Sequence, residues 1–237
     1  MTETKTNVWA KIGAKLLAFV KAIGHFFVDA FQHLPYAFYV QIHPFDGFFR
    51  LKADPRHVSV PCSTLLFVLC GLSAVMRNRM LSFMFQNSVE GYWDPFLDFL
   101  VTVLPYLLWV ISNWCFTSLM DGDGSFRDIY CATGVALIPL TIVNFLQIPL
   151  SYMVTLSEST IYDFLGAFAL VYTYLMLFAG MMTTHQYSVG KSIITTVLTI
   201  VGMAMIVFIV LLMIYLVQQM YGFGDSLYSE IAFRLNE

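Results

Sequence analysis

The sequence predicts an all-α, polytopic membrane protein with five transmembrane helices and an N-terminal amphipathic interfacial helix. Of its 237 residues, 59% are hydrophobic and only 11% are charged, whereas soluble domains carry about 25% charged residues. Five stretches of 20 to 33 residues contain no formal charge, and a spanning helix needs about 20 mainly apolar residues. The net charge of −3 and the absence of a basic tract give no reason to expect a nucleic-acid partner.

The first expected element is a helix from Val8 to about Leu34. Its apolar residues recur at helical spacing, at Ile12, Leu16, Phe19, Ile23, Phe26, Phe27 and Phe31. Lysines at the start and aromatics on one face are typical of a helix that lies on the inner leaflet. The alternative is a helix packed on the protein's own cytoplasmic loops. Pro35 is expected to end or kink this helix, and a linker with His43-Pro44 and Asp54-Pro55 to lead into the first span.

The charge-free stretches place the five spans at roughly residues 58–76, 98–120, 131–156, 162–184 and 192–220. The first span is the weakest, because it contains Pro61 and Ser63 and its apolar stretch barely reaches across a bilayer. The division that follows is an N-terminal amphipathic segment at 1–37, a membrane domain at 38–220 and a short extracytoplasmic tail at 221–237.

The distribution of basic residues predicts the orientation. With a cytoplasmic N-terminus, nine Lys and Arg residues lie inside and three outside, which agrees with the positive-inside rule. We therefore expect a multi-pass protein of the plasma (inner) membrane, with its N-terminus cytoplasmic and its C-terminus extracytoplasmic.

No pattern of reactive residues indicates an enzyme. The chain has no GxSxG, HExxH or P-loop motif. Its four cysteines, Cys62, Cys70, Cys115 and Cys131, form no CxxC pair and are expected to pack as free thiols. We expect no catalytic residue, no metal and no cofactor.

The segment from Asp121 to Phe126, Asp-Gly-Asp-Gly-Ser-Phe, begins like a calcium-binding loop. It lacks the glycine needed at the sixth position, where Phe126 stands, and the glutamate needed at the twelfth, where Ala132 stands. A tight cytoplasmic turn is expected instead. In that turn Gly122 and Gly124 permit positive φ, and Asp123 or Ser125 caps the next helix.

A second motif, Tyr162-Asp163 with Gly222-Phe223-Gly224-Asp225, resembles that of intramembrane aspartyl proteases. Such an enzyme needs two carboxylates that share a proton. Asp225 falls beyond the end of its span, in water, where its pKa has no reason to rise. The Pro-Ala-Leu motif of that family is also absent after Asp225.

Polar residues within the spans leave two interpretations open. Asn113 lies in the second span, and Asn144 and Gln147 lie in the third, but no ionisable residue is expected at depth. The amides either form hydrogen bonds between helices or line the polar path of a permease or channel component.

The residues also carry a family resemblance, over roughly residues 38–220. They include His43-Pro44, Phe48 and Lys52, then Asn113-Trp114 before Asp121-Gly122-Asp123-Gly124-Ser125-Phe126, then Pro139, Glu158 and His185-Gln186-Tyr187-Ser188 with Lys191. This pattern resembles the Yip family of Ypt-interacting-protein-like membrane proteins, and in particular its bacterial branch. Asp123 departs from it, because a lysine is common there, and the N-terminal helix is longer and more aromatic than expected.

The resemblance implies five spans, a cytoplasmic N-terminus and no catalytic residue. Eukaryotic members bind small GTPases, and some bacterial members resemble accessory subunits of ABC-type export systems. We therefore expect an accessory or scaffolding subunit that binds lipid and other integral membrane proteins, either ABC transporter subunits or copies of itself. Its candidate contact residues are Asn113, Trp114, Asp121, Gly122, Asp123, Gly124, Phe126, His185 and Lys191.

Overall fold

The computed structural model describes residues 3–54, 57–85 and 94–235, and the elements in these ranges are all helical. They are α1 (Glu3–Ile42), α2 (Pro44–Ala53), α3 (Val60–Met80), α4 (Pro95–Leu119), α5 (Phe126–Ala136), α6 (Ile138–Met153), the 3₁₀ turn η1 (Leu156–Glu158), α7 (Ser159–His185) and α8 (Val189–Leu235). Five stretches are long and apolar enough to cross a membrane, namely α3, α4, α5 with α6, α7 and α8. The all-helical class and the predicted number of candidate spans are therefore confirmed for the described residues.

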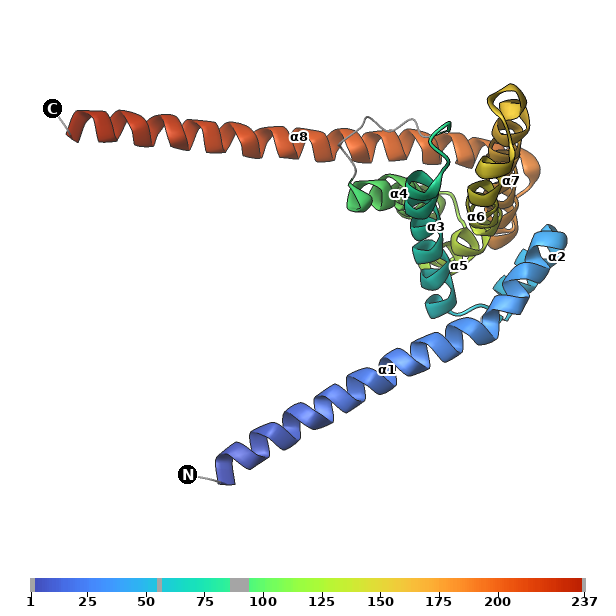
Figure 1. The fold of residues 1–237 in the computed structure, drawn as a ribbon, viewed down its shortest axis with the longest axis horizontal. Helices are drawn as coiled ribbons and strands as arrows, with labels where there is room; N and C mark the ends of the chain where they lie inside the picture. Colours follow the sequence, from blue (N-terminus) through green and yellow to red (C-terminus); the bar gives the residue numbers. More distant parts are fainter. Residues whose placement is uncertain (1–2, 55–56, 86–93, 236–237) are drawn as a thin grey trace.

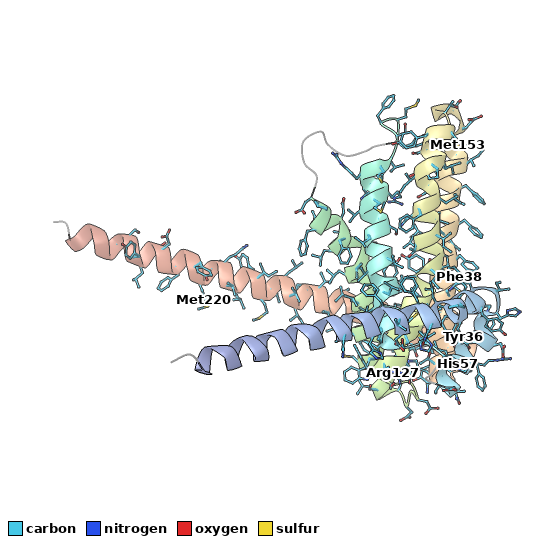
Figure 2. All side chains as sticks on the ribbon, turned by 60° about the horizontal axis from the view of Figure 1, so that its bottom comes forward. Tyr36, Phe38, His57, Arg127, Met153 and Met220 are labelled. Atoms are coloured by element: carbon cyan, nitrogen blue, oxygen red, sulfur yellow. The ribbon has the colours of Figure 1, made fainter. Side chains whose placement is uncertain are left out.

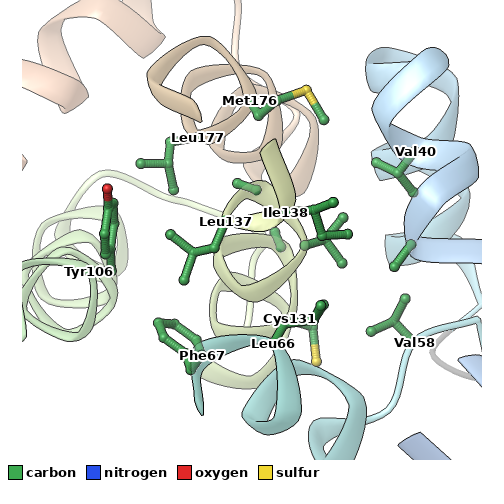
Figure 3. Packing of buried hydrophobic residues seen from close by; sticks show 14 of the residues in the cluster. Val40, Val58, Leu66, Phe67, Tyr106, Cys131, Leu137, Ile138, Met176 and Leu177 are labelled. Atoms are coloured by element: carbon green, nitrogen blue, oxygen red, sulfur yellow. The ribbon is translucent and has the colours of Figure 1, made fainter. Parts of the chain in front are cut away.

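The third span, α5 with α6, lies at the centre of the bundle. It is the most deeply buried of the five, and side chains from α3, α4 and α7 pack around it. Figure 3 shows Leu137 and Ile138 of this span among Phe67, Tyr106 and Met176. In Figure 2, Arg127 and Met153 mark the two ends of the span. We call these ends of the bundle the loop end and the Met153 end.

The third span is not the continuous helix that the sequence predicted. Its two helices meet at Leu137, whose N–H bonds to the carbonyl of Gly134, three residues back, at 3.2 Å. Pro139 lies in the first turn of α6 and has no N–H to donate, so the ladder of α5 cannot continue through it. Gly134 also allows a close helix crossing, because a Cβ built there would lie 2.9 Å from Cβ of Ser63 on α3.

The segment before the first span also differs from the prediction. Pro35 does not end α1, which continues to Ile42, and the expected linker contains α2. Ala37 and Val40 are fully buried in the core, and this packing holds the last turns of α1 in place despite the proline. Figure 1 shows α1 lying across the end of the bundle where α3 begins. Its placement on the inner leaflet stays a prediction.

Helix α8 packs on the bundle only along its first part. Gly202 allows this contact, because a Cβ there would lie 2.4 Å from Oγ of Ser112 on α4. Every residue from 207 to 230 is exposed, and Figure 1 shows this stretch leaving the bundle across the direction of α3 and α7. Met220 lies on this stretch (Figure 2). Lipid or another protein must cover this apolar surface.

Candidate functional site

The turn between α4 and α5 is built by its own backbone and by one capping box. The N–H of Gly122 bonds to the carbonyl of Thr117 at 2.9 Å, and this bond closes the end of α4. Ser125 caps α5: its Oγ accepts from the N–H of Asp128 at 3.3 Å, and its own N–H donates to Oδ2 of Asp128 at 3.0 Å. Of the two caps considered from the sequence, Ser125 is the one used.

The two glycines of this turn have a different role from the one predicted. The positive φ of 54° falls on Asp121, a residue type that tolerates the left-handed region, and not on a glycine. Gly122 and Gly124 instead permit close approach: a Cβ on Gly122 would lie 2.7 Å from Nδ1 of His185, and one on Gly124 would lie 2.7 Å from Cε1 of the same ring. The turn rests directly on a histidine, which local sequence could not reveal.

His185, at the end of α7, joins the turn to two other helices. Its Nδ1 accepts the N–H of Gly124 at 3.3 Å, so the proton of the neutral ring is on Nε2. Nε2 lies 3.1 Å from Oδ1 of Asn113 on α4 and donates to it. The amide nitrogen of Asn113 then donates to Oγ1 of Thr199 on α8 at 3.3 Å, and Thr199 donates to the carbonyl of Thr195 at 2.8 Å.

These bonds form a chain in which each donor meets an acceptor. His185, Asn113 and Thr199 are all buried, where an unpaired polar group would cost roughly 1–3 kcal/mol. Asn113 therefore forms hydrogen bonds between helices, which is the first of the two interpretations that its sequence position left open. We call His185, Asn113, Thr199 and Gly124 the histidine network.

Lys191 and Tyr187 hold the same turn from the side of α8. Nζ of Lys191 donates to the carbonyl of Met120 at 2.7 Å, and the hydroxyl of Tyr187 donates to the same oxygen at 3.0 Å. Met120 ends α4, where a cation and hydrogen-bond donors satisfy a free carbonyl. The ammonium also lies 4.1 Å from the centre of the Tyr187 ring. Burial, with the nearby carboxylates of Asp121 and Asp123, raises the pKa of Tyr187.

The outer side of the turn carries the other predicted contact residues. Trp114 and Phe126 are 43% and 44% exposed, and their rings meet edge to face with centroids 5.8 Å apart. Asp121 and Asp123 are exposed as well. Asp123 reaches Nζ of Lys52 on α2 at 3.9 Å, a partner that the sequence did not suggest for it. The structure thus brings the predicted residues to one end of the bundle but divides them between an internal network and an outer surface.

A second polar cluster lies toward the Met153 end. Arg77 was expected outside the first span, but α3 continues to Met80 and so carries this residue within its last turn. One guanidinium nitrogen, Nη1, donates to Oδ1 of Asn144 at 3.2 Å and to Oε1 of Gln147 at 3.3 Å. Asn144 donates in turn to Oγ of Ser73 at 3.0 Å. Arg77 therefore lies in the last turn of the first span and not in the loop after it, because α3 ends four residues later than the predicted boundary at residue 76.

The two aspartates of the protease-like motif are not brought together. Both Asp163 and Asp225 are exposed. Asp163 lies near the start of α7, whereas Asp225 lies on the stretch of α8 that has left the bundle (Figure 1). The structure therefore offers no shared proton site for this pair.

The cysteines show no disulfide among the described residues. Cys62, Cys70 and Cys131 are buried in the bundle, as expected for small apolar groups. Cys115 is exposed, so the expectation of packing was wrong for this residue.

The comparisons with known proteins assign the chain to a family. A family model, the Yip1 domain, matches residues 38–212, which is well over half of the chain. No match was found among curated proteins or among solved structures. The matched range contains the histidine network and Arg77, and it ends within α8. The chain therefore belongs to the Yip1-domain family of multi-pass membrane proteins.

Proposed function

We propose that the protein is a non-enzymatic adaptor of the plasma (inner) membrane that binds other integral membrane proteins at its loop end. The observation that carries this proposal is the structural role of the His185 side chain. Both of its ring nitrogens are engaged in hydrogen bonds to the protein, so the buried imidazole fixes the shape of the turn. A partner would therefore contact the outer surface of this turn.

That outer surface, which we call the loop platform, consists of Trp114, Asp121, Asp123 and Phe126. It combines two exposed aromatic rings with two exposed carboxylates. Aromatic side chains on a rigid support are the usual anchors of protein interfaces. The carboxylates fit a partner with basic residues, which cytoplasmic loops of membrane proteins carry in excess.

The partner we propose is a subunit of an ABC-type transporter, in line with the resemblance to the bacterial branch of the family, and a second copy of the chain is the other candidate. The exposed stretch of α8 supports an assembly of either kind, since every residue from 207 to 230 is exposed. The proposed orientation places the N-terminus and the loop platform in the cytoplasm.

The polar amides support binding over transport of a solute. Asn113 lines a cavity of about 10 Å³, too small for more than a water molecule. Asn144 lines a different cavity, of about 350 Å³, so the two amides do not line one shared cavity. Both amides are committed to hydrogen bonds between helices.

Site-specific photo-crosslinking in intact membranes tests the proposal. A crosslinking amino acid replaces Phe126 on the loop platform or, as a matched control, Phe164, an exposed aromatic residue on α7. We expect position 126 to capture a protein, identified by mass spectrometry, and position 164 to capture mainly lipid. Asp123→Lys should weaken the capture by reversing one charge of the platform. Equal capture at both positions, or none at position 126, would rule out the loop platform as the contact surface.

A further inference from the structure

One cavity of the bundle lies among α3, α4, α6 and α7, with one side chain from α8. Its volume is about 350 Å³, within the range of small-molecule sites. Most of its wall is apolar, including Ala74, Tyr106, Trp109, Leu140, Val143 and Leu177. Figure 3 shows Tyr106 of α4 and Leu177 of α7, two of these lining side chains. The adaptor function proposed above does not use this cavity.

Among the described residues that line this cavity, Arg77 is the only cationic one. In the described part of the chain, its guanidinium is held by neutral amide oxygens, those of Asn144, Gln147 and Asn78. Its Nε is buried and has no hydrogen-bond acceptor in the described part of the protein. The described carboxylates form no ion pair with it. A half-buried positive charge that lacks an anion is costly, so the cavity wall favours an anionic ligand.

The cavity is ordered from a charged end to an apolar end. Arg77, in the last turn of α3, and Thr102, in the second turn of α4, lie toward the Met153 end. Trp109 and Leu177 lie farther along α4 and α7, toward the middle of the bundle. A ligand with an anionic head group and an apolar chain would match this arrangement, with its head at Arg77 and its chain at the apolar end of the cavity.

The margin of the cavity opens to the side of the bundle. Val101 of α4 and Leu170 and Tyr174 of α7 line it and are themselves exposed. In a membrane these residues face lipid, because both helices are spanning candidates. A ligand that enters between α4 and α7 would come from the bilayer without crossing water.

From these observations we propose that the cavity binds one anionic phospholipid, with its phosphate against Arg77 and one acyl chain along the apolar wall. The phosphate accepts from guanidinium protons of Arg77 that the amides leave unused, which gives the charge-assisted bonds that the neutral amides cannot supply. The acyl chain removes the apolar wall from contact with polar groups. Both the charge of the head group and the apolar chain therefore contribute to binding of the phospholipid.

The test uses the full chain, purified in a neutral detergent and exchanged into nanodiscs of phosphatidylcholine and phosphatidylglycerol in equal amounts. Native mass spectrometry, after release from the nanodisc, counts the phospholipids that stay bound and identifies their class. We expect one phosphatidylglycerol per chain, preferred over phosphatidylcholine by roughly tenfold. Both lipids carry a phosphate, but the choline ammonium of phosphatidylcholine offsets that charge and is repelled by Arg77, so its net attraction to the site is weaker.

Two variants and one control separate the cavity from general surface charge. Arg77→Gln should abolish the preference for phosphatidylglycerol. Ala169→Leu, at a buried residue that lines the cavity, should reduce retention of phospholipid while Arg77 stays in place. Arg79→Gln, which removes an exposed arginine two residues away on the same helix, should leave the preference unchanged. Thermal unfolding without added lipid confirms that each variant is folded. If Arg77→Gln does not fold, Ala169→Leu carries the test.

Competitors identify the source of the anion. Inorganic phosphate alone should not displace the bound phospholipid, because it lacks the chain. Displacement by inorganic phosphate would overturn the proposal, as would binding of oleate in preference to phosphatidylglycerol. Equal loss of preference in Arg77→Gln and Arg79→Gln would mean that surface charge, not the cavity, selects the lipid.

Discussion

The Nε2 proton of His185, at the end of α7, is donated across 3.1 Å to the amide oxygen of Asn113 on α4. The opposite nitrogen of the same ring accepts the N–H of Gly124 from the turn that follows α4. One side chain thus fixes the relation between two helices and the shape of the turn between α4 and α5.

His185→Ala should lower the free energy of unfolding by about 2–4 kcal/mol, because it leaves Gly124 and Asn113 without partners and opens a cavity. Thermal or denaturant unfolding of the purified protein in detergent measures this loss. The matched control is His25→Ala, at an exposed histidine of α1, which should change stability by less than about 0.5 kcal/mol. Equal effects of the two substitutions would contradict the histidine network.

Gly124→Ala should destabilise the protein by about 1–3 kcal/mol, because the added methyl group meets the His185 ring and displaces the turn. Faster proteolysis within residues 121–125 should accompany the loss. Gly190→Ala is the control: a Cβ there meets nothing within 4 Å, and alanine in a helix is favoured over glycine by roughly 0.5–1 kcal/mol. A neutral Gly124→Ala would show that the turn does not rest on the histidine.

Cysteine labelling in intact cells should report the N-terminus inside and the C-terminus outside. In a background with the four native cysteines replaced, Asp225→Cys should react with an impermeant reagent and Asp123→Cys should not. Replacing Cys115 matters most, since it is the exposed native thiol among the four. The opposite labelling pattern would overturn the topology and place the loop platform outside the cell.

Asp163→Asn and Asp225→Asn should each leave protein abundance and partner capture unchanged, because both carboxylates are exposed and lie on separated parts of the chain. Exposed substitutions of this kind change stability by less than about 0.5 kcal/mol. Immunoblotting and the crosslinking assay described above measure both properties. Complete loss of function in both variants, with normal protein levels, would restore the protease hypothesis.

Much of the fold follows from local composition. Charge-free stretches located all five spans, because burying a charge in lipid is costly and charges therefore collect at helix ends. The observed helix boundaries differ from the predicted ones at several places. Pro139 divides the third span into two helices, and α3 continues past the predicted boundary at residue 76 to Met80. Pro35 stays within α1 because the packing of Ala37 and Val40 offsets its lost hydrogen bond.

By itself, the sequence determined the number of spans, the capped turn at 121–126 and the residues that gather at one end of the bundle. These features depend on hydropathy and turn chemistry within short windows. Only the tertiary structure decided which polar groups meet. His185 and Asn113 are 72 positions apart, and Arg77 and Asn144 are 67 apart. Such partners are chosen by how helices cross, and crossing depends on packing over the whole bundle, which no local pattern encodes.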